Sequence, residues 1–506
     1  MEVHKLNLDS LGRFSPLLFD YLNQDQKIQP FYNRFPDLDN FSSQILEKSN
    51  QKIDRNTLVK SLLIQNEGLK LSKLSSSNIE ALEADTTFTV TTGHQLCLFT
   101  GPLYFIYKII SCINLAQKLN NQFEDKHFVP VFWMASEDHD FEEINHVHLF
   151  GKKVSWNNDK KGPVGRMQLQ DFDEVLDDLN SILGEGENAA YLSSLFKEAY
   201  SKKNLAQASR YLVNELFGKY GLVIIDGDDA LLKSKLESIV KNDVEKSKYF
   251  KQLSSTTNAL GLHYKKQAHV REINFFKLSD GSRKRIESNQ DLDLPLDSYS
   301  PNVLMRPLFQ ELVLPNVAYV GGGAEIAYWM QLKDVFDSEN IVFPMLVLRN
   351  SALVLDSSKS KKINKLNLKL EDLFLTESQL HKSYVLRNTN FSDDFSTQNN
   401  AIEELYSALA DKFEDSAIKS SIDAEKNKNL KSFDSLAKKL LKYEKNKHAI
   451  SLNQISNLKK ALFPQDSFQE RFDSFIPYYL KYGEDFIKIL KEEFDPLDTN
   501  FVILAH

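Results

Sequence analysis

The sequence has little of what defines secreted, membrane-spanning or nucleic-acid-binding proteins. Its 506 residues include only two cysteines, Cys97 and Cys112, too few to crosslink so long a chain, so we expect a reducing, cytoplasmic location. No apolar run approaches the roughly 18 residues of a transmembrane helix, and the first residues lack the basic and apolar regions of a secretory signal. The formal net charge of −8 disfavours binding to phosphate backbones. We therefore expect neither a membrane nor a nucleic acid as a partner.

What is present is an alternation of apolar strands and helices. The composition, 42% hydrophobic and 26% charged, is that of a globular protein. Five apolar segments end in glycine or polar residues and are separated by helical patterns: TFTVTTGHQ (87–95), FVPVFWMAS (128–136), GLVIIDGDD (221–229), NVAYVGGGAE (316–325) and IVFPMLVLRN (341–350). Such alternation predicts an α/β fold in which helices cover both faces of a parallel sheet.

Composition changes along the chain predict four parts. We expect a helical N-terminal segment that packs on the core (1–85), the α/β core (86–389), a helical arm (390–463) and a C-terminal helical segment that returns to the core (464–506). Two insertions interrupt the core. The first, 152–218, reads as helical and polar, and the second, 262–301, contains a predicted strand pair around the turn Ser279–Asp280–Gly281.

The arm is predicted from helical spacing without strand signals. Ile402, Leu405, Leu409 and Phe413 recur every three or four residues, and a looser apolar stripe continues through 418–440. Return through ISLNQISNLKKAL (450–462) would form an antiparallel coiled coil, which Pro464 ends. Because an exposed stripe promotes aggregation, we expect a partner helix to cover these side chains.

Polar residues gather at the ends of the predicted strands. Gly93, His94 and Gln95 follow the first strand, acids follow the second and third, a glycine run with Glu325 follows the fourth, and Arg349 ends the fifth. Ligands of open α/β sheets bind beyond the carboxyl ends of the strands. We therefore predict one cleft there, faced by His94, Asn145, Arg306 and Glu325.

Two of these features have competing interpretations. The glycines of GHQLCLFTG and VGGGAE match neither a Walker A loop nor a G-x-G-x-x-G fingerprint. They either bring backbone N–H groups to a phosphate or carboxylate or only form tight turns. Arg306, set among apolar residues, either forms a structural ion pair with Glu311 or Glu325 or anchors an anionic substrate.

The cluster after the second strand also allows two interpretations. Its histidines and acids have the composition of a metal site, although their spacing fits poorly: His139, His146, His148, Asp138, Asp140, Glu142 and Glu143. Alternatively, the acids mark the N-terminus of a helix, where negative charge is stabilised. Cys97 and Cys112 lie among apolar residues and are expected to act as small core side chains.

Four long blocks of the sequence resemble the bacillithiol-biosynthesis cysteine-adding enzymes, a family of cysteine ligases. The blocks are TGHQLCLFTGPLYFIYKIISCINLAQKL, VPVFWMASEDHDFEEINHVHL, SPNVLMRPLFQELVLPNVAYVGGGAEIAYWMQLKDVF and LFPQDSFQERFDSFIPYYLKYGEDFIKIL. The resemblance implies a Rossmann-like core related to nucleotidyltransferases and a coiled-coil arm that forms a homodimer. It also implies a ligase that adds L-cysteine to glucosaminyl malate.

The resemblance further implies a set of site residues. Amide formation from a free carboxylate is uphill, so the implied reaction requires activation of the carboxylate by ATP or another nucleotide. A role for a metal ion stays open. Gly93, His94 and Gln95 would hold the phosphates, although this family often has glutamine where His94 stands. The acids after the second strand and the glycine run with Glu325 match the family's blocks, but the individual roles are inferred from chemistry: the candidate bases are Glu137, Asp138 and His139, and the other candidate binding residues are Gly101, Asn145, Arg306, Gly321, Gly322, Gly323, Glu325, Tyr328 and Arg349. The alternative function is a nucleotide-binding scaffold without ligase activity, whose arm organises partners.

Overall fold

A five-stranded parallel sheet forms the centre of the protein. The computed structural model describes residues 1–506 except 171, 280, 288–293 and 391–393. The sheet order is β11-β10-β2-β3-β6, and every neighbouring pair is parallel. The strands are β2 (Thr87–His94), β3 (His127–Met134), β6 (Val223–Asp226), β10 (Asn316–Gly321) and β11 (Met345–Leu348). All five predicted strands are confirmed.

The strand order reverses between β2 and β10. From β2 the chain adds β3 and then β6 on one side, and it later adds β10 and β11 on the other side. Ligand sites of open α/β sheets lie at such a reversal. Helix α5 (Tyr104–Gln122) leads from β2 to β3, and α14 (Gly323–Met330) and α15 (Lys333–Glu339) lead from β10 to β11. The arrangement is Rossmann-like, as expected.

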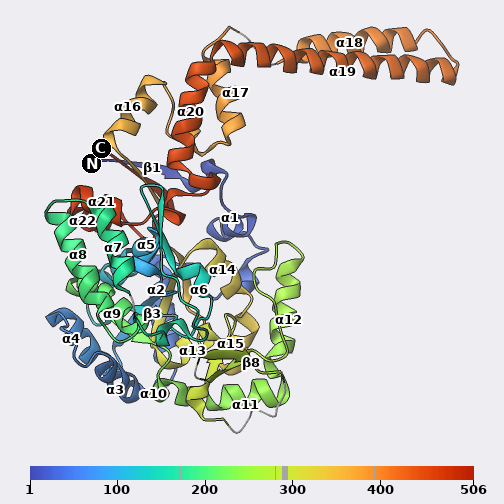
Figure 1. The fold of residues 1–506 in the computed structure, drawn as a ribbon. Helices are drawn as coiled ribbons and strands as arrows, with labels where there is room; N and C mark the ends of the chain where they lie inside the picture. Colours follow the sequence, from blue (N-terminus) through green and yellow to red (C-terminus); the bar gives the residue numbers. More distant parts are fainter. Residues whose placement is uncertain (171, 280, 288–293, 391–393) are drawn as a thin grey trace.

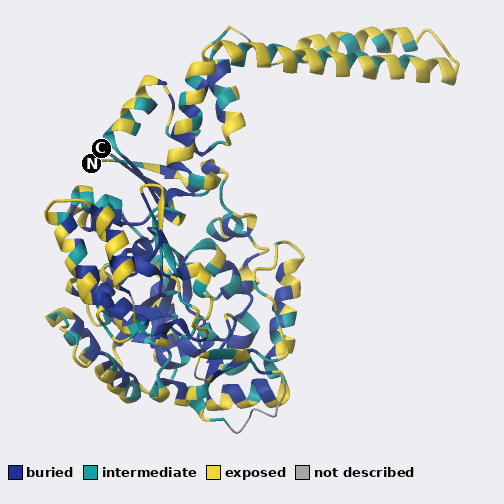
Figure 2. Cartoon of the chain, in the orientation of Figure 1, coloured by how far each residue is buried: buried dark blue, intermediate teal, exposed yellow. Residues whose placement is uncertain are grey.

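Apolar layers cover both faces of this sheet, which lies in the buried interior of the body (Figure 2). On one face α5 and α2 (Leu38–Ser49) pack against Phe88, Val90 and Val320. On the other, α13 (Arg306–Val313) and α14 pack against Val131 and Tyr319. The sheet is therefore a rigid support for whatever binds at its edge.

The first insertion is more apolar inside than its composition suggests. After β5 (Lys152–Ser155) it forms α7 (Asp173–Leu183), α8 (Glu187–Tyr200) and α9 (Leu205–Phe217). These helices bury Leu179, Leu192 and Leu212 in a common core. The helices of the insertion are amphipathic. Their exposed polar faces explain why the sequence indicated a polar segment.

The second insertion forms a small antiparallel sheet. Strands β7 (Phe275–Ser279) and β8 (Ser282–Arg285) confirm the predicted pair, and β9 (Tyr299–Pro301) adds to β7. The first strand begins later than predicted, since residues 269–274 precede it. Asp280 of the predicted turn lies outside the described residues.

A second sheet joins the two ends of the chain. Strand β13 (Asn500–Ala505) lies between β1 (Glu2–Asn7), to which it is antiparallel, and β12 (Ala352–Leu355), to which it is parallel. The termini are accordingly side by side (Figure 1). The first and last segments are thus not helical throughout. The short alternating pattern of β1 becomes a strand because β13 supplies its hydrogen bonds.

The predicted coiled-coil arm is confirmed, but the prediction that it returns through 450–462 is wrong, because the returning helix lies earlier in the chain. Helices α18 (Ser396–Ala410) and α19 (Ser416–Lys447) run side by side and project from the body (Figure 1). They lead into α20 (Ala449–Leu462), which buries Leu452 and Ile455 at the base of the arm, beside α17 (Glu377–Arg387).

The stripe predicted on α18 is split between two faces. Ile402 is half-buried towards α19, as is Tyr406, whose hydroxyl accepts a hydrogen bond from Asn429 Nδ2 at 2.8 Å. Leu405 and Leu409 are 67% and 40% exposed. Tyr406 takes the position that faces α19, so Leu405 and Leu409 stay uncovered within one chain, and their cover by a partner helix stays a prediction.

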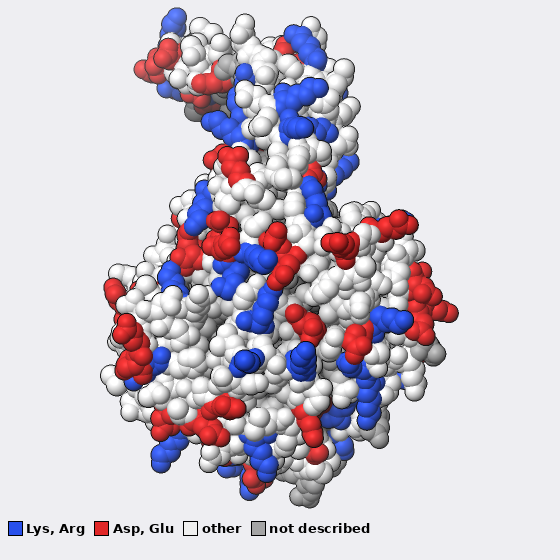
Figure 3. All heavy atoms as spheres, turned by 90° about the vertical axis from the view of Figure 1, so that its left-hand side faces the viewer, with Lys and Arg blue, Asp and Glu red and all other residues white. Residues whose placement is uncertain are grey.

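Charge on the surface is mixed in sign. On the face shown in Figure 3, basic and acidic side chains are interspersed over the body. Within the described part of the chain, every helix is too short or too polar to cross a bilayer.

Candidate functional site: a cavity at the reversal of strand order

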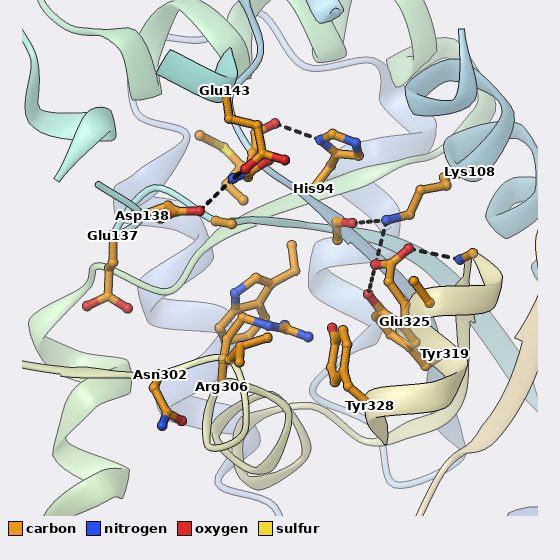
Figure 4. Close-up of a pocket in the computed structure, with 18 of the residues that line it drawn as sticks. His94, Lys108, Glu137, Asp138, Glu143, Asn302, Arg306, Tyr319, Glu325 and Tyr328 are labelled. Atoms are coloured by element: carbon orange, nitrogen blue, oxygen red, sulfur yellow. Dashed lines mark hydrogen bonds and ion pairs between the residues drawn. The ribbon is translucent and has the colours of Figure 1, made fainter. Parts of the chain in front are cut away.

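A cavity of about 500 Å³ opens at the carboxyl ends of β2, β3 and β10, where the strand order reverses (Figure 4). It brings together ten of the predicted site residues: Gly93, His94, Gln95, Glu137, Asp138, Arg306, Gly322, Glu325, Tyr328 and Arg349. The prediction of a single cleft is therefore confirmed for His94, Arg306 and Glu325. Parallel strands explain it, because their carboxyl ends share one edge of the sheet.

Asn145 does not line this cavity. It follows the single-turn helix α6 (Phe141–Ile144), where its carbonyl accepts the Trp156 N–H at 2.7 Å and its Oδ1 lies 3.0 Å from His146 Nδ1. The prediction for Asn145 is wrong because α6 ends after one turn and directs it to the strand pair β4 (His146–Leu149) and β5.

His139 lies just outside the cavity wall. Its half-exposed ring packs near Phe276, and its Nδ1 lies 3.1 Å from Arg283 Nη1. Three glycines are also outside. Gly101 has φ +65°, and a Cβ there would lie 2.6 Å from Cys97 Cβ, so it serves a tight turn. Gly321 and Gly323 flank the cavity-lining Gly322.

Arg306 carries a charge that the fold does not compensate. Its Nη1 donates to Gln310 at 3.0 Å, its Nη2 is enclosed without a hydrogen-bond partner, and its guanidinium lies over the Tyr319 ring. The suggested ion-pair partners are engaged elsewhere, Glu311 with Lys48 at 3.3 Å and Glu325 with Lys108 at 2.8 Å. Among the described residues no carboxylate forms an ion pair with Arg306, which favours the anion-anchor interpretation.

A second feature joins the ends of β2 and β10 across the cavity. Lys108, buried on α5, donates to the Gly93 carbonyl and to Glu325 Oε1. Glu325 also accepts the Gly322 N–H and the Tyr319 hydroxyl, both at 2.8 Å. Burial opposes ionisation of Glu325, but Lys108 and these donors hold its pKa at about 2. Glu325 is therefore an ionised carboxylate that caps α14.

Sequence reasoning missed Lys108, although a signal was present. The residue interrupts the apolar helix pattern YFIYKIIS, and a buried ammonium requires a partner in the same way as Arg306 does. Tyr104, Tyr319, Arg283, Asn302 and Arg471 also line the cavity and were not predicted.

His94 is neutral in this setting. Burial, and next the charge of Lys108, lower the pKa of its imidazole to about 3. Its Nδ1 lies 3.1 Å from the Gln95 carbonyl oxygen and 3.8 Å from Cys97 Sγ. Burial raises the pKa of both cysteine thiols to about 12, so each remains protonated in the core, as predicted.

Two predicted acids occupy the opposite wall. Glu137 lies 2.7 Å from Lys233 Nζ, and Asp138 accepts a hydrogen bond from Gln95 Nε2 at 2.7 Å. Burial raises the pKa of Glu137, although Lys233 opposes the shift. Lys233 also contacts Asp228 at 2.8 Å, so Glu137 shares its counter-charge. Glu137 is thus a carboxyl whose proton affinity is increased at the cavity.

The helix interpretation of the acid and histidine cluster is confirmed. Asp140 caps α6, with its Oδ1 3.4 Å from the Glu143 N–H. His146 and His148 are neighbours on β4, with ring centroids 5.3 Å apart, and His148 stacks on Phe472. Within the described ranges no three His, Cys, Asp or Glu side chains are grouped so as to hold a metal ion.

Arg349 has a mainly structural environment. Its Nη2 lies 2.6 Å from Glu470 Oε1, and its Nη1 donates to the Asn350 carbonyl and to Ser351. Only the Nε group, enclosed and without a partner, lies towards Gly322, at 3.8 Å from the position of a Cβ there. Arg349 therefore has fewer N–H groups available to a ligand than Arg306 has.

The parallel sheet, with a cavity where its strand order reverses, defines a Rossmann-like α/β protein. A coiled-coil arm is added to this body. Family profiles agree with this division. The "Bacillithiol biosynthesis BshC, N-terminal Rossmann-like domain" matches residues 1–295 and 292–350, and the "Bacillithiol biosynthesis BshC, C-terminal coiled-coil domain" matches 352–506. The chain belongs to the bacillithiol biosynthesis BshC family.

Full-length relatives bear the same family name. The chain is 42% identical to a protein of Christiangramia forsetii (100% of this chain, 99% of the relative) and 40% identical to one of Flavobacterium johnsoniae (99% of each). A protein of Bacillus cytotoxicus is 25% identical over 99% of this chain and 100% of its own length. Each is named "Putative cysteine ligase BshC".

Proposed function

We propose that the protein is a ligase that joins the carboxyl group of L-cysteine to the amino group of glucosaminyl malate. The full-length similarity to proteins named as cysteine ligases supports the reaction class. The observation that carries the proposal is the uncompensated guanidinium of Arg306 in the cavity at the strand-order reversal. A half-buried cation with an enclosed, unpartnered N–H group in that place favours binding of a carboxylate or phosphate.

A nucleotide such as ATP supplies the activation of the cysteine carboxylate when it is bound. The cavity fits such a group in two respects. Gly93 leaves room for close approach, since a Cβ there would lie 3.3 Å from the Trp133 carbonyl oxygen and 3.9 Å from Arg306 Nη1. Arg306 supplies positive charge beside that turn. The N-terminus of α14 is less suited to phosphate, because the ionised Glu325 already caps it.

Glu325 is instead suited to an ammonium group. Its carboxylate is ionised, lines the cavity, and retains acceptor capacity beyond the Gly322 N–H on Oε2. L-Cysteine carries an ammonium and a carboxylate on neighbouring atoms. We assign the ammonium to Glu325, which accepts the Tyr319 hydroxyl, and the carboxyl side to Arg306, which lies over the Tyr319 ring.

Glu137 is the proposed proton acceptor. The amino group of the acceptor must lose a proton as its nitrogen bonds to the cysteine carbonyl carbon. Glu137 lines the cavity and has a raised pKa, which brings its proton affinity closer to that of the amine. Asp138 accepts a hydrogen bond from Gln95 and so positions the Gln95 side chain.

We further propose that the ligase is a cytoplasmic homodimer. The arm leaves Leu405, Leu409 and Phe413 40–67% exposed on a helix pair, and a second copy would cover them. Two free, buried thiols suit a reducing compartment.

The test uses purified protein with L-cysteine, glucosaminyl malate and ATP. We expect a thiol product whose mass equals the two substrates minus one water, absent when ATP is omitted. Thiol labelling and mass spectrometry detect it. Cells that lack the protein should accumulate glucosaminyl malate. Binding of the substrates without any product would refute the ligase and support the scaffold alternative.

A further inference from the structure

A second cavity, of about 520 Å³, adjoins the first. The two share a wall that includes Arg283, Asn302 and Tyr328. In Figure 4, Asn302 and Tyr328 lie with Arg306 across the first cavity from Glu143. The far side of the second cavity is formed by the second insertion, through Arg271 and Arg285. The insertion thus extends the site beyond the sheet edge.

Strand β8 directs two arginines to this cavity. Arg283 and Arg285 alternate with the exposed Lys284, so they share one face of the strand. Their guanidinium carbons lie 4.0 and 4.9 Å from the centre of the Phe276 ring. Arg283 is held in place by the Pro301 carbonyl at 2.8 Å and by Ser300 Oγ at 3.1 Å.

Acidic charge acts on these cations from beyond ion-pair distance, from Glu137 and Asp138 on Arg283 and from Glu287 on Arg285. In the described part of the chain no carboxylate forms an ion pair with Arg271, Arg283 or Arg285. Arg271 and Arg285 line the same cavity, and the charge of Arg271 adds to burial in lowering the pKa of Arg285. Several other arginines form ion pairs, for example Arg166 with Asp228 at 2.6 Å. The ionised Glu325 also lines this cavity, on the wall shared with the first, so three guanidinium groups face one carboxylate and a further anion would offset the remaining positive charge.

We infer that this second cavity binds the malyl dicarboxylate of the acceptor substrate, with Arg271 and Arg285 as its carboxylate ligands. The inference rests on the proposed function. Two carboxylates on a short chain need two planar donors on one wall, which these arginines provide. The sugar would then lie at the junction near Asn302 and Tyr328, and its amine would face Glu137 in the first cavity.

The test measures acceptor binding by calorimetry on the full-length protein. The probe is glucosaminyl malate, and glucosamine is the matched probe without the dicarboxylate. We expect Arg285→Gln and Arg271→Gln each to weaken binding of glucosaminyl malate at least tenfold. Lys284→Gln, which removes the same charge from the opposite face of β8, should change it less than twofold. Arg285→Lys keeps the charge but loses the planar pair of N–H donors, so its affinity for glucosaminyl malate should lie between those of the wild type and Arg285→Gln.

Two results would overturn the inference. One is unchanged affinity for glucosaminyl malate in both arginine variants. The other is loss of ATP affinity with acceptor affinity intact, which would assign the cavity to phosphate. If Arg285→Gln melts well below the wild type, Arg271→Gln carries the test, because Arg271 is exposed. Acceptor binding without product formation would refute the ligase but leave this inference standing.

Discussion

Replacing Arg306 with methionine should abolish most activity without unfolding the protein. Arg306 lines the cavity, and no carboxylate among the described residues pairs with it. A charge-assisted hydrogen bond to an anionic substrate contributes about 1.5–3 kcal/mol. At 1.4 kcal/mol per factor of ten, its loss lowers kcat/KM by between about tenfold and a hundredfold. Arg306→Lys should be intermediate, because lysine keeps the charge but not the planar donors.

The stability of the same variant provides the sharper comparison. Arg306→Met removes a charge with no ion-pair partner and loses the bond to Gln310, about 1 kcal/mol, together with the contact of the guanidinium with the Tyr319 ring. Lys48→Met is the matched control, because it leaves the fully buried Glu311 without its cation, 3.3 Å away. Breaking a buried pair on one side costs about 3–5 kcal/mol.

Urea unfolding followed by circular dichroism, together with product formation per folded molecule, distinguishes the two roles. We expect Arg306→Met to lose activity and keep its unfolding midpoint, and Lys48→Met to lose stability and keep its activity when folded. An Arg306→Met protein as unstable as Lys48→Met, with normal turnover per folded molecule, would refute the anion-anchor role.

Three further predictions follow from the geometry. Glu137→Gln should lower product formation at least tenfold with little change in melting temperature. His139→Ala, outside the cavity wall, should lower product formation less than threefold, and equal losses in the two variants would contradict Glu137 as the base. Leu405→Glu with Leu409→Glu should convert a dimer to a monomer in light scattering, and an unchanged mass would exclude these exposed side chains from the interface. Burial, and next the charge of Arg13, lower the pKa of Lys459 from 10.5 to about 7. The unfolded chain therefore holds this proton at higher pH than the folded one, and the free energy of unfolding should rise between pH 7 and 10.5. Lys459→Met should flatten that rise in urea titrations, and an unchanged pH dependence would count against the burial effect.

The sheet was predictable because its strands are buried on both faces. Each strand reads as a continuous apolar run that ends at a glycine or a charged residue, which also locates the edge where ligands bind. The chain ends were not predictable in the same way. Strand β1 carries a short mixed pattern, EVHKLN, and its partner β13 lies at the other end of the sequence.

Side-chain pairing limited the prediction of the site. The pattern marked Arg306 as unusual, but only the structure shows that Glu311 is engaged by Lys48 and Glu325 by Lys108. On α18, Leu405 lies three residues after Ile402 and Tyr406 lies four residues after it. Both spacings place the residue on the same helix face as Ile402, so the sequence does not distinguish them. Which of the two faces α19 depends on the hydrogen bond from Asn429, on another helix.

The pairing of β1 with β13 has a consequence for how the chain folds during synthesis. β1 leaves the ribosome before the other described strands, yet the strand that pairs with it follows all of them, and Lys5 reaches Asp498 across 493 positions. The five-stranded sheet has all its strands once residue 348 has emerged. The small sheet cannot close before the arm and the C-terminal helices have emerged. The five-stranded sheet can therefore form early, while the base of the arm is fixed only after β13 has emerged.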